Sequence, residues 1–205
     1  IESLRVFKRG KVEIQDISSQ AVVDFINPGI GIKILDYCAG AGGKTLAIAS
    51  LVKGKGKFFV HDKKIARMKT FSIRSKRAGF KATMIPTTDL EKLGEDFDLV
   101  VSDVPCSGTG AWRRNPQGKW WLTENMLEYL VSEQRKILNS SSQLVKKGGY
   151  LAFVTCSILN IENDQQVAWF LSQHRDFLLV KDKFISPLIG GDGFYVAMLK
   201  KSDEN

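Results

Sequence analysis

Two cysteines of this chain, Cys106 and Cys156, each lie just past an apolar run that is typical of a β-strand. A thiolate can add to an electron-poor ring and so split one difficult group transfer into easier steps. Carbon 5 of a cytosine or uracil becomes reactive toward a methyl donor once a thiolate has added at carbon 6. The alternative for each cysteine is a buried small hydrophobe, the common state of a free thiol. Their shared position at strand ends favours catalysis.

A glycine-rich segment follows a third strand-like run that ends at Asp36, and it reads Cys38-Ala39-Gly40-Ala41-Gly42-Gly43-Lys44. Its glycines allow a tight turn and a close approach of the backbone to a ligand, and the next helix offers its free N–H groups there. The spacing is not that of a P-loop, whose first glycine would fall at Cys38, nor that of G-x-G-x-x-G. The segment therefore predicts a cofactor loop, and a nucleotide-hydrolysing enzyme is disfavoured.

Carboxylates follow the next two predicted strands, at Asp62 and Asp89. An acid in the place of Asp62 can hydrogen-bond a ribose diol, and Asp89 is placed to contact the amino group of a base. Acids around a glycine loop favour a nucleoside cofactor with positive charge, such as S-adenosylmethionine. The alternative is an ordinary turn in which Asp36 and Asp62 are solvated caps.

Three further residues complete the chemistry predicted at these strand ends. Lys44 is the candidate cation that favours the thiolate form of a cysteine. Asp103 is placed to face the exocyclic amine and ring nitrogen of the base, and Cys106 could remove the carbon-5 proton. We expect no metal, because the histidines His61 and His174 are isolated and no Cys-x-x-Cys pair is present.

Apolar runs alternate with segments of helical periodicity, which predicts an α/β fold with helices on both faces of the sheet. We expect a mostly parallel, seven-stranded sheet with an antiparallel edge strand, in a single domain over residues 1–205 with 1–28 as its lead-in segment. The carboxyl ends of parallel strands meet at one edge, where such folds bind ligands. Strands are expected over 32–36, 57–61, 82–85, 97–103, 150–154, 177–180 and 194–199, with a short one at 12–14, and helices over 18–26, 44–52, 63–78, 124–145 and 160–172.

The composition indicates which kind of partner the protein binds and in which cellular compartment it is expected. With 205 residues, 43% of them hydrophobic, the chain can bury a core of its own. Thirty Lys and Arg against 22 Asp and Glu give a net charge of +8, which favours RNA or DNA, although a basic solvated surface remains equally open. Three cysteines without a disulfide pattern predict a cytoplasmic protein. No apolar run approaches the ~20 residues of a membrane span.

A segment from Trp112 to Trp121 mixes Arg113, Arg114 and Lys119 with three tryptophans, close to the predicted active-site strand. Cations for phosphates and flat rings for unstacked bases are typical of single-stranded RNA recognition. The alternative is that the tryptophans belong to the core and only the arginines are exposed. A target cytosine must be unpaired or flipped out to reach Cys156.

Together these motifs resemble the RNA cytosine-5 methyltransferases of the Sun/nucleolar-protein family, most closely its RsmB-like bacterial branch, which acts on small-subunit (16S) ribosomal RNA. The similarity covers nearly the whole chain, although Ala41 stands where the family usually has proline. The matching segments are 12–19, 36–45, 103–110, 113–116, 155–157, 162–163 and 192–194.

The resemblance implies roles that spacing does not give. Cys156 is then the nucleophile of an S-adenosylmethionine-dependent RNA cytosine-5 methyltransferase, and Cys106 assists product release. The resemblance also implies the Rossmann-like, S-adenosylmethionine-dependent methyltransferase fold. Members of the family usually carry an RNA-binding domain upstream of the catalytic core or beside it. This chain has little room for one and does not begin with Met, so an upstream domain is expected to be missing. The alternative is a basic RNA-binding module that has kept the fold and lost catalysis. Cofactor contacts are implied for Cys38, Ala39, Gly40, Ala41, Gly42, Gly43, Lys44, Asp62, Arg67, Asp89 and Asp103.

Overall fold

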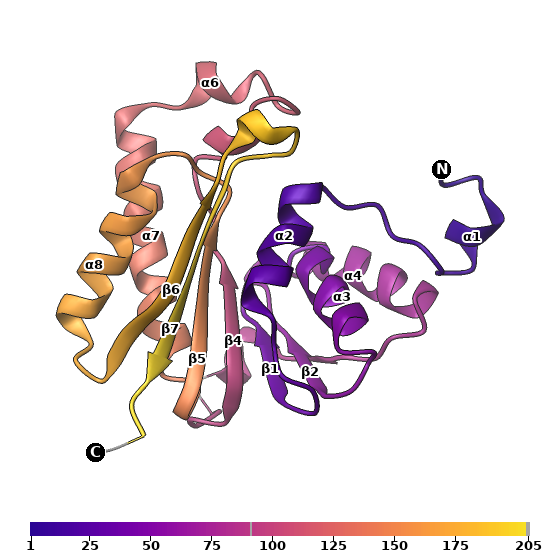
Figure 1. The fold of residues 1–205 in the computed structure, drawn as a ribbon, viewed down its shortest axis with the longest axis horizontal. Helices are drawn as coiled ribbons and strands as arrows, with labels where there is room; N and C mark the ends of the chain where they lie inside the picture. Colours follow the sequence, from indigo (N-terminus) through magenta and orange to yellow (C-terminus); the bar gives the residue numbers. More distant parts are fainter. Residues whose placement is uncertain (91, 204–205) are drawn as a thin grey trace.

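Seven strands form one sheet in the computed structural model, which describes residues 1–90 and 92–203 (Figure 1). The strand order is β3-β2-β1-β4-β5-β7-β6, and β7 alone runs in the direction opposite to the other six strands. The predicted Rossmann-like sheet is confirmed, with the reversed strand one place inside the edge. The strands are β1 (Lys33–Asp36), β2 (Lys57–Val60), β3 (Thr83–Met84), β4 (Phe97–Asp103), β5 (Val145–Thr155), β6 (Phe177–Ile185) and β7 (Phe194–Lys201).

Helices cover both faces of the sheet, with α2, α3 and α4 on one side and α7 and α8 on the other (Figure 1). Because successive strand side chains point to opposite faces, Ile34 packs with α2 and α3, whereas Leu35 packs with α7 and α8. The helices are α1 (Arg5–Lys8), α2 (Ile17–Ile26), α3 (Gly43–Leu51), α4 (Ile65–Arg77), α5 (Thr87–Leu90), α6 (Gly118–Trp121), α7 (Glu124–Ser142) and α8 (Asp164–Gln173). None of the described helices is long and apolar enough to cross a lipid bilayer.

Several sequence predictions differ from the structure. The strands expected at 150–154 and 177–180 are longer, as β5 and β6, and the helix expected at 160–172 is a 3₁₀ turn, Asn160–Glu162, followed by α8. The strand expected at 12–14 is wrong, because Val12 and Ile14 are about half exposed and join no sheet. The helix expected to reach residue 145 ends at Ser142. The carbonyl of Leu144 there accepts the N–H of Phe97, so that the chain enters the sheet.

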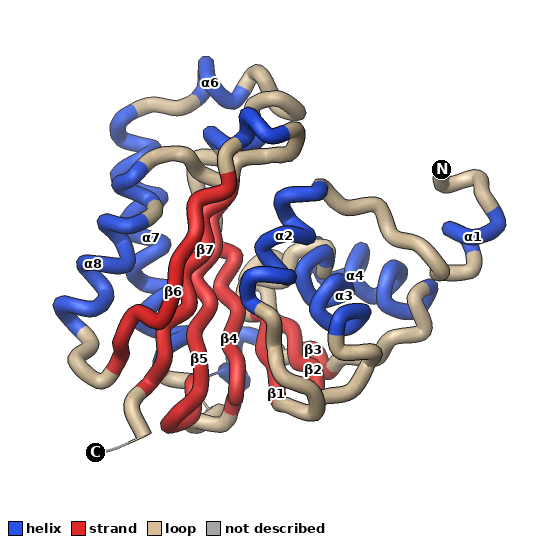
Figure 2. The backbone as a smooth tube through the Cα atoms, in the orientation of Figure 1, coloured by secondary structure: helices blue, strands red, loops and turns tan. Residues whose placement is uncertain are grey.

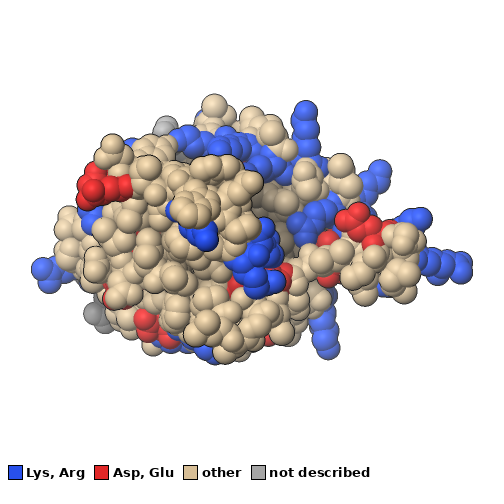
Figure 3. All heavy atoms as spheres, turned by 90° about the horizontal axis from the view of Figure 1, so that it is seen from above, with Lys and Arg blue, Asp and Glu red and all other residues tan. Residues whose placement is uncertain are grey.

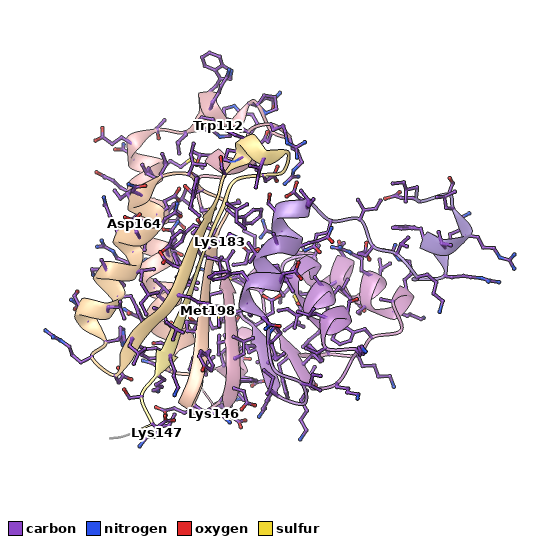
Figure 4. The ribbon with its side chains drawn as sticks, in the orientation of Figure 1. Trp112, Lys146, Lys147, Asp164, Lys183 and Met198 are labelled. Atoms are coloured by element: carbon purple, nitrogen blue, oxygen red, sulfur yellow. The ribbon has the colours of Figure 1, made fainter. Side chains whose placement is uncertain are left out.

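The parallel strands end together at the upper edge of the sheet, which we call the rim (Figure 2). The segments that follow β1, β2, β4 and β5 lie at the rim. The segment between β6 and β7 joins them, because β6 ends there and β7, which runs in the opposite direction, begins there. Trp112 lies at this end of the molecule, whereas Lys146 and Lys147 lie at the opposite end, near the start of β5 (Figure 4). The rim segments are 37–42, 61–64, 104–122, 156–163 and 186–193.

Candidate active site

The glycine loop between β1 and α3 is held against β2. The N–H of Ala39 donates to the carbonyl of His61 at 2.9 Å. Gly40 donates its N–H to Oδ2 of Asp62, also at 2.9 Å. Gly42 has a φ of +78°, and a Cβ atom there would lie 2.0 Å from Cδ2 of Phe71. Glycine is therefore required at position 42, where the loop packs against α4. At Gly40, whose φ is +54°, an added Cβ atom would meet only Oδ2 of Asp62, at 3.9 Å, so the loop leaves backbone open beside that carboxylate.

The predicted cofactor acids lie in different surroundings. Asp62 is buried, and its carboxylate accepts the N–H groups of Gly40 and Lys64, with Nη1 of the exposed Arg67 at 3.9 Å. Its oxygens have further lone pairs for a ligand hydroxyl. Asp89 is instead about half exposed and pairs with Lys92 at 2.6 Å. A cofactor contact by Asp89 stays a prediction.

Asp36 is buried at the end of β1, so the alternative of a solvated cap is wrong at this position. Its Oδ2 accepts a hydrogen bond of 2.5 Å from Thr45. Its Oδ1 has no hydrogen-bond partner among the described residues. Burial raises the pKa of Asp36 to about 7, and the negative charge of Asp103 acts in the same direction. An orphaned acceptor beside the loop is consistent with a ligand that donates a hydrogen bond there.

Lys44 and Asp103 form an ion pair that joins the start of α3 to the end of β4. Nζ of Lys44 lies 2.6 Å from Oδ2 of Asp103, and the lysine side chain is only 6% exposed. The same ammonium lies 4.7 Å from the ring centre of Phe194, on β7. The pair therefore places a buried positive charge between the cofactor loop and the strand that leads to Cys106.

The two predicted thiols are neighbours, with Sγ of Cys106 3.3 Å from Sγ of Cys156. The pKa of Cys156 is lowered, chiefly because its sulfur accepts a hydrogen bond from Cys106, and the charge of Lys44 helps against the opposing effects of burial and Asp103. The pKa of Cys106 is raised well above its usual range by the same hydrogen bond and by burial. The structure thus contains one sulfur disposed to be a thiolate and one disposed to keep its proton.

The arginines predicted to bind RNA are engaged within the protein. Asp192, which is fully buried, accepts hydrogen bonds from Nε of Arg114 at 2.8 Å and from Nη2 of Arg113 at 3.2 Å. Arg113 also lies 3.2 Å from the carboxylate of Asp16, which caps α2. Both guanidinium groups remain about half exposed. They hold the 104–122 segment to the turn before β7, and RNA contact by them stays a prediction.

The aromatic part of this segment is divided between surface and interior. Trp120 and Trp121, on the short helix α6, are 77% and 62% exposed, whereas Trp112 is partly buried. Nζ of the exposed Lys119 lies 4.9 Å from the ring centre of Trp120. Viewed onto the rim, Lys and Arg side chains border a hollow in the surface (Figure 3). The alternative that all of these tryptophans belong to the core is therefore wrong for Trp120 and Trp121.

Glu162 and Asp192 are fully buried acids to which the sequence analysis assigned no role. Glu162 accepts hydrogen bonds from residues beside Cys106, and Asp192 binds the two arginines. Both lie in segments that match the resembled family, and this match is the signal by which they could have been found. Their contacts could not be predicted, because their partners are distant in sequence. Among the described residues, no group of three or more His, Cys, Asp or Glu side chains could hold a metal ion.

Comparisons with known proteins agree with this geometry. Residues 23–200 match the family model described as 16S rRNA methyltransferase RsmB/F. The ribosomal RNA small subunit methyltransferase B of Photorhabdus laumondii is 38% identical over an alignment 208 residues long, which covers 95% of this chain and 48% of that protein. The chain thus spans about half the length of the curated relatives it matches.

Solved structures share the fold. The crystal structure of PH0851 superposes with a TM-score of 0.92 at 31% identity, covering 98% of this chain and 49% of that one. NSun6 from Pyrococcus horikoshii, solved with SFG, gives a TM-score of 0.85 at 24% identity over 100% of this chain and 56% of that one. At this lower identity the likeness shows the fold alone.

Proposed function

Since the chain belongs to the 16S rRNA methyltransferase RsmB/F family, we propose that it methylates carbon 5 of a cytosine in RNA, with S-adenosylmethionine as the methyl donor. The proposed substrate is small-subunit ribosomal RNA, and residues 1–205 are proposed to act as one catalytic domain. The observation that carries the proposal is the pair of sulfurs 3.3 Å apart at the rim, within reach of the charges of Lys44 and Asp103.

Cys156 is the proposed nucleophile. Its thiolate forms a bond to carbon 6 of the cytosine, and the electron pair of the carbon 5–carbon 6 double bond moves toward carbon 5. Asp103 faces the exocyclic amine and ring nitrogen and stabilises the adduct. Support comes from the lowered pKa of Cys156, caused first by the hydrogen bond from Cys106, because the thiolate is the reactive form.

The cofactor is proposed to lie against the glycine loop. When bound, S-adenosylmethionine supplies the electrophilic methyl group that the activated carbon 5 takes up. The backbone of residues 38–44 would hold it, Asp62 would accept hydrogen bonds from its ribose, and Arg67, Asp89 and Asp103 complete the proposed contacts. The open backbone at Gly40, beside Asp62, and the unpaired Oδ1 of Asp36 support this fit.

Cys106 is the proposed base for product release. Once Cys156 is bonded to carbon 6 it is a neutral thioether, so the hydrogen bond that raises the pKa of Cys106 is lost. Cys106 can then release its proton to water and remove the proton from carbon 5. The electron pair of that carbon–hydrogen bond restores the double bond, and the carbon–sulfur bond breaks with its electrons returning to Cys156.

RNA is proposed to approach across the rim, with its target cytosine unpaired or flipped out. Support comes from the net charge of +8 and from the exposed Lys119, Trp120 and Trp121 beside the site. Cations attract the phosphates, and exposed rings offer faces on which unstacked bases can lie.

The test uses purified wild-type protein, Cys156→Ala and Cys106→Ala with a labelled cytosine-containing ribosomal RNA fragment and S-adenosylmethionine. We expect wild-type protein to methylate carbon 5 and Cys156→Ala to form neither product nor adduct. Cys106→Ala should accumulate a protein–RNA adduct that survives denaturation. Adduct formation by Cys156→Ala but not by Cys106→Ala would reverse the two roles, and absence of methylation by the wild-type protein would contradict the proposed function.

A further inference from the structure

Each of the two cysteines is held in place by hydrogen bonds to the residues before and after it. Glu162 holds the neighbours of Cys106, partly through Gln134, and the adjacent Asn163 holds the neighbours of Cys156. We propose that Glu162 is a positioning residue for Cys106 in product release, and that Asn163 is a positioning residue for Cys156 in the attack on carbon 6. This inference rests on the proposed function. It goes beyond that proposal because it divides the two chemical steps between two neighbouring side chains that need not touch the RNA.

Glu162 holds the Cys106 side. Its Oε1 accepts the backbone N–H of Ser107 at 2.8 Å, and its Oε2 accepts the hydroxyl of Ser107. Oε1 also accepts Nε2 of Gln134 at 2.9 Å, and the same amide donates to the carbonyl of Pro105 at 3.1 Å. Residues 105 and 107 are therefore both fixed through one carboxylate, and Cys106 between them has little freedom to turn.

The supporting shell of Glu162 is buried and polar. Gln134 and Gln166 are fully buried, and Nε2 of Gln166 donates to Oε1 of Gln134 at 2.7 Å and to the carbonyl of Val131 at 2.9 Å. A buried carboxylate is stable only when it is well hydrogen-bonded. This network thus ties the Cys106 loop to α7 and α8, which are rigid helices of the fold.

Asn163 holds the Cys156 side in the same way. Its Oδ1 accepts the hydroxyl of Thr155 at 2.5 Å, and its Nδ2 donates to the carbonyl of Ser157 at 3.0 Å. The carbonyl of Cys156 itself accepts the N–H of Gly110 at 3.0 Å. Asn163 is 3% exposed and has no charge. One amide therefore fixes both neighbours of the nucleophile.

The two steps require different sulfurs to be aimed at different atoms. In the attack, the sulfur of Cys156 must approach carbon 6, whereas in release the sulfur of Cys106 must reach the proton on carbon 5. A displacement of about 1 Å can slow a positioned reaction on the order of 10²-fold. We call the hydrogen bonds made by Glu162 and those made by Asn163 the two clamps. Loosening one clamp should therefore slow one step more than the other. The negative charge of Glu162 also acts on Cys106 and makes it a stronger base.

The experiment compares Glu162→Ala with Asn163→Ala, and it uses Cys106→Ala as the reference for blocked release. Each variant is incubated with labelled RNA and S-adenosylmethionine, and the denaturation-resistant adduct and the methylated product are followed in time. We expect Glu162→Ala to accumulate adduct while product formation falls on the order of 10²-fold. Asn163→Ala should form adduct slowly and accumulate none.

A conservative variant separates positioning from folding. Glu162→Gln keeps an acceptor for the Ser107 N–H and for Gln134, so we expect turnover within a few-fold of wild type and no adduct build-up. Binding of S-adenosylhomocysteine should be unchanged in all three variants, because neither clamp contacts the glycine loop. If Glu162→Ala does not fold, Ser107→Ala tests the contact of Glu162 with the Cys106 side. It removes the hydroxyl bonds to Glu162, Thr109 and Ser157 but keeps the Ser107 N–H bond to Glu162, and it should accumulate adduct partially.

The outcomes distinguish this inference from the proposed function. If Cys106→Ala accumulates adduct but Glu162→Ala and Ser107→Ala release product like the wild type, the positioning role of Glu162 is wrong. Loss of adduct formation in Glu162→Ala, as in Asn163→Ala, would also overturn the division. If wild-type protein methylates no cytosine, the proposed function fails first.

Discussion

Nζ of Lys44 lies 2.6 Å from Oδ2 of Asp103, so that the last residue of the cofactor loop is paired with the last residue of β4. The lysine side chain is almost fully buried, whereas one third of the aspartate side chain remains exposed. The pair connects the proposed methyl-donor pocket with the proposed base pocket through a single contact. Its charges also reach Cys156, where Lys44 lowers and Asp103 raises the pKa, after the larger effects of the Cys106 hydrogen bond and of burial.

Removal of this ammonium should harm both stability and catalysis. Lys44→Met leaves Asp103 without its cation, and we expect the free energy of unfolding to fall by about 2 kcal/mol, below the value for a fully buried pair. Methyl transfer should fall as well. Lys92→Ala, which breaks the exposed pair with Asp89, is the matched control and should leave stability unchanged in denaturant titrations. Equal losses in the two variants would contradict a special role for the Lys44 pair.

Gly42→Ala tests the packing of the glycine loop against Phe71 of α4. A Cβ atom at this position would meet the ring of Phe71 at 2.0 Å, and the positive φ adds strain of about 1 kcal/mol. Gly79→Ala has a similar positive φ but no heavy atom within 4 Å of the added Cβ, so it carries the φ strain alone. We expect Gly42→Ala to lose more stability and to weaken S-adenosylhomocysteine binding in calorimetry. Cofactor affinity equal to that of Gly79→Ala would mean that the loop tolerates the clash.

Asp36 should make stability depend on pH. Burial raises its pKa from 3.8 to about 7, so between these values the folded state holds a proton that the unfolded state has released. Stability therefore falls as pH rises through this window and levels off above it. Asp36→Asn should remove this part of the fall, on the order of a few kcal/mol, in urea titrations across the window.

Thr45→Val provides the complementary measurement on the same carboxylate. It removes the hydrogen bond that lowers the pKa of Asp36, so the fall in stability should extend to higher pH. Identical pH profiles for wild type, Asp36→Asn and Thr45→Val would show that Asp36 does not titrate as described.

Substitutions of Arg114 and Lys119 should have different effects, because the first cation has a structural role and the second is proposed to bind RNA. Arg114→Ala removes two hydrogen bonds to the buried Asp192 and should cost about 1–3 kcal/mol in thermal or denaturant unfolding. Lys119→Ala should leave stability unchanged but weaken RNA binding and reduce its salt slope by about 1. Affinity for RNA measured over a range of salt concentrations decides this, and an unchanged slope in Lys119→Ala would remove that residue from the interface.

Much of the fold could be read from the sequence because the signals are local. The apolar runs that became β1, β4 and β7 are buried on both faces, and the alternation of Ile34 and Leu35 between two cores follows from the period of a strand. The glycine loop was also predictable, because closely spaced glycines after a strand indicate a tight turn, and Gly40 and Gly42 have positive φ angles there. The strand expected at 12–14 failed because local alternation cannot show whether a neighbouring strand is available.

By itself the sequence determined which residue types meet at the rim, since the carboxyl ends of parallel strands meet at one edge of the sheet. That edge holds Cys106, Cys156, Lys44 and Asp103. Only the tertiary structure decided how they are arranged. The 3.3 Å between the sulfurs, the orphaned oxygen of Asp36 and the capture of Arg113 and Arg114 by Asp192 all depend on side chains distant in sequence. Burial and hydrogen bonding set the protonation of a group, and both are properties of packed neighbours that no local pattern contains.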